Sequence, residues 1–198
     1  MARLQLNKSS LARQAAQLQS YERFLPSLDL KRQQLMGERA RARTEAKALR
    51  AEVDALVQEV GERLPMLAQR DIDLDGLVEL TAYDLAEVNV VGVKVPELSG
   101  VEIAVRPYSP MAKPHWVDTA ADLLKQVIEA RLRVAVAEQR VVLFEKAVDT
   151  ITQRVNLFEK VLIPQTRANI KRIRIYLNDE QIQGVVRSKL SKKKRAAS

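Results

Sequence analysis

The chain has 198 residues with no cysteine and one histidine, and its 33 basic and 25 acidic side chains give a net charge of +8. An apolar content of 46% is too high for a disordered polyelectrolyte. Since the sequence has neither an apolar run of the roughly 18 residues that cross a bilayer nor the apolar core of a secretory signal, we expect a folded cytoplasmic protein.

The N-terminal third carries a heptad pattern that predicts a long helix over residues 4–68. Positions taken every seven residues from Leu11 to Leu67, with partners three residues further on, are apolar at 13 of 17 sites. The exceptions are Gln14, Arg32, Arg39 and Arg63. Arginines in such a seam extend to its rim or pair with acids of a partner helix. Pro26 predicts a kink, or a break followed by a restart capped by Ser27.

The middle segment, residues 69–117, lacks the heptad pattern and has a different amino-acid composition. Leu74–Ala86 is compatible with one short helix. Two stretches rich in β-branched residues, Asn89–Val95 and Val101–Arg106, flank a turn-like stretch at Pro96–Gly100 and predict a β-hairpin over about residues 89–106. Four of the seven prolines fall between residues 96 and 114 and predict an extended return path after the hairpin.

The C-terminal part predicts a second long helix over residues 118–190, with Asp118 or Thr119 as its N-cap. From Ala120 to Leu162, thirteen positions at alternating steps of three and four residues are all apolar. The residues between them are mostly charged, so only one stripe needs burial. Pro164 indicates a possible bend, and residues 191–198 are predicted to form a basic, flexible tail.

Two seams separated by about fifty residues bury each other only if the chain folds back on itself. The sequence therefore predicts a mainly α fold, in which the N- and C-terminal segments form a long antiparallel two-helix coiled coil with a small β-hairpin-containing excursion in the middle. A helix over residues 118–190 is on the order of 105 Å long, so we expect a slender rod.

Motifs that would indicate catalysis are missing. The sequence contains no glycine-rich phosphate loop, no GxSxG elbow and no HExxH, and His115 is the one histidine. Asp71, Asp73, Asp75 and Gly76 match part of a calcium loop, but Ala82 occupies the position of the bidentate glutamate, so an acidic turn is the better interpretation. We expect a protein without enzymatic activity, cofactor or metal, in which Trp116 is a packing anchor.

Charge is distributed unevenly along the chain. Residues 67–117 hold 4 basic and 8 acidic groups, whereas residues 164–198 hold 10 basic and 2 acidic groups. Nucleic-acid binding usually adds aromatic stacking to basic charge, and Tyr176 is the one aromatic residue in the basic stretch. An apolar pattern continues through the same stretch, which favours a protein socket of opposite charge.

The stretch from Ile151 to Leu177 resembles the D subunit of the V-type and archaeal-type rotary ATPases, whose C-terminal helix has a pattern like R-V-N-x-x-E-x-x-x-I-P followed by an isoleucine-rich basic helix. The matching residues are Arg154, Val155, Asn156, Glu159, Ile163 and Pro164, then Ile170 and Ile173. A weaker N-terminal match comprises Leu6 and Asn7, then Leu28, Lys31, Arg32 and Leu35. The resemblance covers essentially the full length.

The resemblance implies the central rotor shaft of an ATPase or ATP synthase, which transmits torque between the A/B head that handles ATP and the ion-translocating ring in the membrane. The implied partners are the A and B subunits, the F subunit and the collar subunit (d or C) on the ring, with no nucleic acid and no direct membrane insertion. Its place would be cytoplasmic, peripheral to the membrane within a membrane-bound complex. The candidate partner-binding residues are those of the C-terminal motif, Arg154, Val155, Asn156, Glu159, Ile163 and Pro164, followed by Arg167, Lys171, Arg172 and Arg174.

Two other classes share some of these features. A coiled-coil export chaperone, or the stalk of a type III secretion ATPase, has the helical hairpin but no need of a β-containing excursion. A basic coiled coil on nucleic acid or an anionic membrane would show a steep salt dependence of binding. The choice between proton and sodium transport, and the direction of the motor, stay open because ion selection belongs to membrane subunits.

Overall fold

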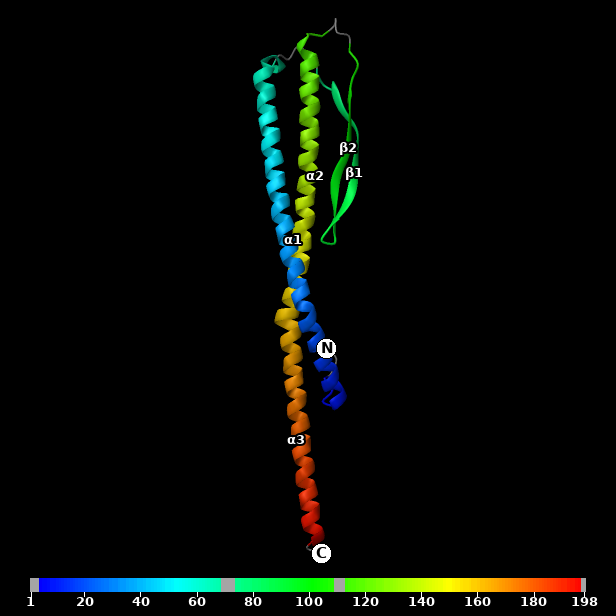
Figure 1. Ribbon diagram of the computed structural model, residues 1–198, viewed down its shortest axis with the longest axis vertical. Coiled ribbons are helices and arrows are strands. Elements are labelled where there is room, and N and C mark those ends of the chain that lie inside the picture. The colour runs from blue at the N-terminus through cyan, green and yellow to red at the C-terminus, as the bar shows by residue number, and fades with distance from the viewer. Residues whose placement is uncertain (1–3, 69–73, 109–112, 197–198) are drawn as a thin grey trace. The chain divides into compact units, whose positions relative to one another are not determined.

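The computed structural model describes residues 4–68, 74–108 and 113–196. The elements follow in the order α1 (Lys8–Arg63), a short 3-10 helix η1 (Pro65–Ala68), β1 (Val78–Val90), β2 (Val93–Val105), α2 (Trp116–Leu157), a π-helical turn η2 (Phe158–Leu162) and α3 (Ile163–Ala196) (Figure 1). By its contacts the chain divides into two units, residues 1–32 with 150–198 and residues 33–149. We call them the terminal unit and the central unit.

In the central unit, α1 and α2 run antiparallel. Arg50 pairs with Glu138 at 2.6 Å, and Arg43 pairs with Glu145. Between these two pairs the residue number falls along α1, from 50 to 43, while it rises along α2, from 138 to 145, so the two helices run in opposite directions. These pairs are largely exposed and contribute about 0–1 kcal/mol each, so they select the helix register more than they stabilise the fold.

In the terminal unit, the first part of α1 pairs with α3 in the same antiparallel sense. Arg167 contacts Glu22 at 2.6 Å, and the Asn169 side-chain amide donates to Gln14 Oε1 at 3.3 Å. The rings of Tyr21 and Phe158 meet edge to face with centroids 5.4 Å apart. The predicted fold class, two long helices in antiparallel pairing with a β-hairpin between them, is therefore confirmed.

The predicted seams are the buried stripes of the helices. Among the thirteen positions from Ala120 to Leu162, nine are buried and four are half-buried. On α1, every described seam side chain except Arg63 is buried or half-buried. The arginines at positions 32 and 39 are half-buried, as expected for side chains that extend to the rim of a seam. Each fully buried aliphatic residue contributes about 1.5–3 kcal/mol, so the seams dominate the stability of both units.

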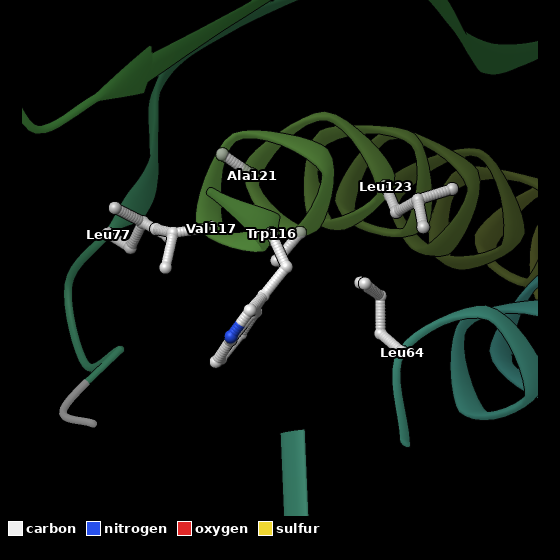
Figure 2. Close-up of a cluster of buried hydrophobic side chains, with 7 residues drawn as sticks. Leu64, Leu77, Trp116, Val117, Ala121 and Leu123 are labelled. Atoms are coloured by element: carbon white, nitrogen blue, oxygen red, sulfur yellow. The ribbon is translucent and has the colours of Figure 1, made fainter. Parts of the chain in front are cut away.

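A hydrophobic cluster joins the end of α1 to the beginning of α2 in the central unit. Leu64, Leu77 and Trp116 are 5%, 3% and 7% exposed, and Val117 is fully buried (Figure 2). Trp116 is thus a packing anchor, at the first position of α2. Because Leu77 directly precedes β1, the same cluster also holds the base of the hairpin against the helices.

The hairpin is longer than predicted and turns at a different place. Its strands pair from Val78–Val105 to Val90–Val93, so Val91 and Gly92 form the turn. Both have positive φ angles, 53° and 80°, as a type I′ hairpin turn requires. The predicted strand bounds and the predicted turn at Pro96–Gly100 are wrong, because a valine in the left-handed region carries no turn signal in a sequence.

The residues expected to form the turn and the short helix lie in the two strands instead. Pro96 lies within β2 opposite Glu87, which is tolerated because a two-stranded sheet leaves an unpaired edge on each strand. The pairing register shifts between Asp84 and Leu85, and this irregularity absorbs the Ser99–Gly100 stretch that resembles a turn. The short helix predicted over residues 74–86 is also wrong, since most of that stretch is β1.

The helix ends follow local chemistry. Asn7 caps α1, because its side-chain oxygen accepts from the Ser10 backbone N–H at 2.7 Å. Helix α1 continues through Pro26, and the Ser27 hydroxyl donates back to the Phe24 carbonyl at 2.8 Å, so the restart capped by Ser27 is wrong. Helix α2 begins before the predicted caps, and α3 extends to Ala196 through most of the predicted flexible tail.

Candidate functional site

The C-terminal motif lies in the terminal unit and brackets the π-helical turn η2. Arg154, Val155 and Asn156 precede η2 at the end of α2, Glu159 lies within it, and Ile163 begins α3. The Ile163 backbone N–H donates to the Phe158 carbonyl, five residues back, which is the hydrogen bond that defines a π turn. The residues that carry the resemblance therefore mark a widened helical turn.

The spacing of buried residues explains why the helix widens here. Val155 and Ile163 are consecutive members of the buried stripe at 2% and 7% exposure, yet they are eight residues apart instead of the seven of a heptad. A π turn takes up the extra residue and keeps Ile163 on the seam. The predicted seam positions Phe158 and Leu162 are accordingly only half-buried.

Pro164 and Thr166 belong to the same irregular turn. Proline lacks the N–H that an α-helix needs and clashes with the carbonyl four residues back, at a cost of about 3 kcal/mol in a regular helix. The Thr166 hydroxyl, in a side chain only 6% exposed, donates to the Leu162 carbonyl at 2.6 Å. Proline, π turn and buried threonine thus form one local arrangement.

This arrangement predicts the effect of removing a residue. Deleting the exposed Val161 together with Pro164→Ala should restore a seven-residue seam in a regular helix, and should change the free energy of unfolding by less than about 2 kcal/mol. Deleting Val161 alone should cost about 3 kcal/mol more, because Pro164 then lies in a regular helix. Urea unfolding followed by circular dichroism measures both values.

The control is deletion of Val142, which is as exposed as Val161 but lies in a regular part of α2. Removing it turns the following residues by about 100° away from the seam. Each displaced seam residue loses about 1.5–3 kcal/mol of burial energy. Equal destabilisation by the two deletions would contradict the role assigned to the π turn.

The candidate partner-binding residues divide into buried and exposed groups. Val155 and Ile163 are buried within the terminal unit, so their side chains shape the helix pair. Asn156 is half-buried. The exposed candidates are Arg154, Glu159, Pro164, Arg167, Lys171, Arg172 and Arg174. The exposed set is available to a partner and is predominantly cationic.

Three of these cations line a groove between α1 and α3. Arg167, Lys171 and Arg174 lie at steps of four and three residues and so share one face of α3. The groove has a volume of about 440 Å³. Its remaining lining consists of Ala15, Leu18, Gln19 and Glu22 from α1 and Ile170 and Ile175 from α3. Arg172 is exposed but does not line it.

The groove has an apolar floor and a basic rim. Leu18 and Ile170 supply apolar surface, and Glu22 pairs with Arg167 at the rim. Such a surface suits a protein segment that presents an apolar side chain beside acidic ones. Sequence reasoning missed the α1 side of this groove, although the predicted antiparallel pairing of the two seams is the signal that would have located it.

Beyond this groove, α3 continues without a covering helix. Gln14 lies beside Asn169, and α1 begins only six residues before Gln14, so the pairing ends near residue 175, and Leu177 is the last half-buried residue of α3. Every side chain from residue 178 to 195 is exposed. We call this stretch the α3 end. Its exposed apolar residues are Ile182, Val185, Val186 and Leu190, at 49–55% exposure.

The spacing of these apolar residues puts them on one stripe of the helix. The surrounding basic residues are Arg187, Lys189, Lys192, Lys193, Lys194 and Arg195. An apolar stripe with a basic surround, left open by its own chain, has the composition of a contact surface for an acidic partner.

Within the described residues, two other kinds of site, a metal centre and a membrane-spanning helix, are not found. Within residues 4–68, 74–108 and 113–196, no cluster of three or more histidine, cysteine or acidic side chains could hold a metal ion. Two positions of the calcium-like sequence, Asp71 and Asp73, lie outside that range. None of the helices in the described part of the chain has a stretch long and apolar enough to cross a membrane.

Comparison with known proteins assigns the chain to a family. Residues 10–193 match the family of the ATP synthase D subunit. The V-type ATP synthase D subunit of Borreliella burgdorferi is 31% identical, over 97% of this chain and 95% of the relative. The proteins of the same name from Chlamydia trachomatis serovar L2 and Chlamydia muridarum are 30% and 31% identical, each over 98% of this chain and 96% of the relative. The chain therefore belongs to the family of V-type ATP synthase D subunits and is a component of such a complex.

Proposed function

We propose that this chain is the central rotor shaft of its ATP synthase or ATPase complex. In this role it transmits torque between the A/B head, where ATP is hydrolysed or made, and the membrane ring that moves ions. It makes and breaks no bonds itself. Its location is cytoplasmic, on the membrane surface as part of the complex. Family membership supports a place in the complex, and the helix pairing supports the mechanical role.

The observation that carries the proposal is the α3 end, residues 178–195, with its uncovered apolar stripe and basic surround. A helix that exposes this surface in isolation is built to be enclosed by other subunits, and a positive charge directs it to an acidic enclosure. Insertion of the α3 end into the A/B head satisfies both requirements.

The groove rimmed by Arg167, Lys171 and Arg174 is the second part of the contact with the head. The three cations lie on one face of α3, so the surface is not the same all round. When a shaft with unequal faces rotates, each surrounding subunit contacts a different face of the shaft at each rotation angle. Differences of about 1–3 kcal/mol between such states are enough to couple one site to another.

The remaining motif residues and partners complete the proposal. Arg154, Glu159 and Pro164 are exposed on the same unit and are proposed to contact partner subunits directly. Val155, Asn156 and Ile163 act through the shape of the widened turn. The F subunit and the collar subunit are proposed partners elsewhere on the shaft. Neither an export chaperone nor a nucleic-acid-binding coiled coil is favoured by the family match over residues 10–193.

A rotation experiment tests the role directly. The chain has no cysteine, so Asn89→Cys provides a single labelling site on the exposed part of β1. A bead attached there in a complex immobilised by its head should turn in one direction when ATP is added. The same complex with a non-hydrolysable nucleotide is the control. ATP hydrolysis with a bead that keeps a fixed orientation would refute the proposal.

A further inference from the structure

The hairpin of the central unit has an inner strand and an outer strand. Residues 97–101 of β2 line a groove of about 470 Å³ together with residues of α1 and α2. Consecutive side chains of a strand project from opposite faces of the sheet, so five consecutive lining residues place the edge of β2 along this groove. Every residue of β1 from 79 to 89 is exposed, whichever face it projects from. Strand β1 is therefore the outer strand.

The edge of β1 that faces away from β2 is free to pair with a further strand. The sheet consists of β1 and β2, and alternate residues of such a pair turn their backbone N–H and C=O groups away from the partner strand. The pairing register shifts once within β1, between Leu80 and Ala82, and the second shift is taken up by Ser99 of β2. Residues 82–88 thus form a regular stretch about 24 Å long, which we call the outer edge.

The outer edge lacks the residues that usually keep an edge strand unpaired. Proteins protect such strands with lysine, with proline or by making the strand very short. Strand β1 has 13 residues and contains no proline, lysine or arginine. Strand β2 contains both protective types, Lys94 and Pro96. The more exposed strand is thus the unprotected one, as expected for an edge that receives a strand from a partner.

One face of the hairpin at the outer edge is apolar. Tyr83 and Leu85 lie opposite Val101 and Leu98, and residues directly opposite in an antiparallel pair project from the same face. Tyr83 and Leu85 are 51% and 43% exposed. A strand added beside β1 would therefore gain contacts with both side chains if its own residues on this face are apolar.

The other face is acidic. Asp84 projects from it between Ala82 and Ala86, and the register places Glu102 opposite Ala82 and Glu97 opposite Ala86. All three carboxylates belong to exposed residues. Because alanine side chains are short, the long side chain of a lysine or arginine on an added strand can lie over them and reach the carboxylates of β2. This face therefore selects basic residues.

A second copy of this chain is a poor occupant of the outer edge. Strand β1 carries Glu79, Asp84 and Glu87 and no basic residue. Side-by-side pairing of two copies of β1 brings like charges together, and like charges on neighbouring strands are destabilising. A strand with basic residues has the opposite effect, because it neutralises Asp84.

We propose that the outer edge accepts an extended segment of another protein subunit as a third strand, and that this segment alternates apolar residues with lysine or arginine. The apolar residues lie beside Tyr83 and Leu85, and the basic residues lie on the acidic face. The outer edge belongs to the central unit, whereas the cationic groove and the α3 end belong to the terminal unit, so this docking does not depend on the rotor role.

Hydrogen exchange tests the backbone pairing. Backbone N–H groups without a hydrogen-bond partner exchange rapidly with solvent, and pairing with an added strand slows them. Exchange at single-residue resolution is measured by mass spectrometry on the purified chain and on the assembled complex. About every second amide of residues 82–88 should exchange roughly 100-fold more slowly in the complex. Equal rates in the chain and the complex would overturn the proposal.

A charge reversal and a crosslink test the chemistry of the partner. Asp84→Lys should lower the protection of these amides roughly tenfold, since it opposes a basic strand. Asp54→Lys makes the same charge change at an exposed position of α1 and should leave the protection unchanged. Circular dichroism verifies that each variant keeps its helices. Equal effects of the two reversals would contradict the proposed charge selection.

The crosslink identifies the added segment. A photoreactive benzoylphenylalanine replaces Tyr83, an aromatic residue of similar shape, in a chain co-expressed with all other subunits of the complex. The expected product joins position 83 to an apolar residue of another subunit that has lysine or arginine as a sequence neighbour. A crosslink to a second copy of this chain, or to a segment without basic residues, would refute the assignment.

Discussion

Replacing Arg167, Lys171, Arg172 and Arg174 together by glutamine is expected to weaken coupling between ATP hydrolysis and ion movement while leaving helix content unchanged. All four side chains are exposed, so the helix pair loses only the Arg167–Glu22 contact, which is worth about 0–1 kcal/mol. The proposed contact with the head would lose the basic rim of the groove. A coupling energy of about 1–3 kcal/mol corresponds to a roughly 5- to 150-fold change in affinity between states.

The measurements are the affinity of the purified chain for the A/B head and the number of ions transported per ATP in reconstituted vesicles. A matched control replaces Lys31, Arg41, Lys47 and Arg131 by glutamine, which removes the same charge from exposed positions outside the groove. If the variant without Arg167, Lys171, Arg172 and Arg174 retains normal assembly and ATP-driven transport, these four cations have no role in coupling. An equal loss in both variants would indicate a general effect of net charge.

Phe144→Ala is expected to be the most destabilising single truncation in the central unit, at about 3–5 kcal/mol. Phe144 is 1% exposed and is the largest of the fully buried side chains. It fills the seam at one level of the pairing, so its truncation leaves a cavity between the helices. Urea unfolding of the isolated chain measures the loss, which corresponds to a melting temperature lower by roughly 6–20 °C.

Val142→Ala is the matched control for this truncation. Val142 lies two residues away on the same helix but is 45% exposed, so its loss should cost less than about 1 kcal/mol. Similar values for Phe144→Ala and Val142→Ala would mean that the seam through α2 does not carry the stability of this unit. The same comparison then separates burial from helix propensity, because both substitutions introduce alanine.

The apolar periodicity predicts burial correctly along the long helices, where one physical rule, the burial of an apolar stripe, applies over many residues. The heptad positions on both helices are nearly all buried or half-buried, because only one stripe of each helix is apolar enough to be removed from water. The same rule predicts that the helices pair, and the separation of the two seams along the chain predicts that they pair antiparallel. The basic character of the C-terminal stretch is likewise a property of composition alone.

Prediction failed where two local rules compete. Proline and glycine predict a hairpin turn at Pro96–Gly100, whereas the strand register and the bulge place the turn at Val91–Gly92. The heptad pattern predicts a seam through Phe158 and Leu162, whereas the buried stripe resumes at Ile163 after a π turn. In both cases the outcome depends on pairing with residues far away in the sequence.

The amino-acid sequence alone determined the helical class, the antiparallel pairing, the absence of recognisable catalytic motifs and the family resemblance, because periodicity, composition and short motifs are local properties of the chain. Only the tertiary structure decided which residues are available to partners. In the folded chain Val155 and Ile163 are buried, Arg167, Lys171 and Arg174 lie together at a groove with α1, and the α3 end stays uncovered. The exposure of a side chain depends on which segments pack against it, and those segments are often distant in the sequence.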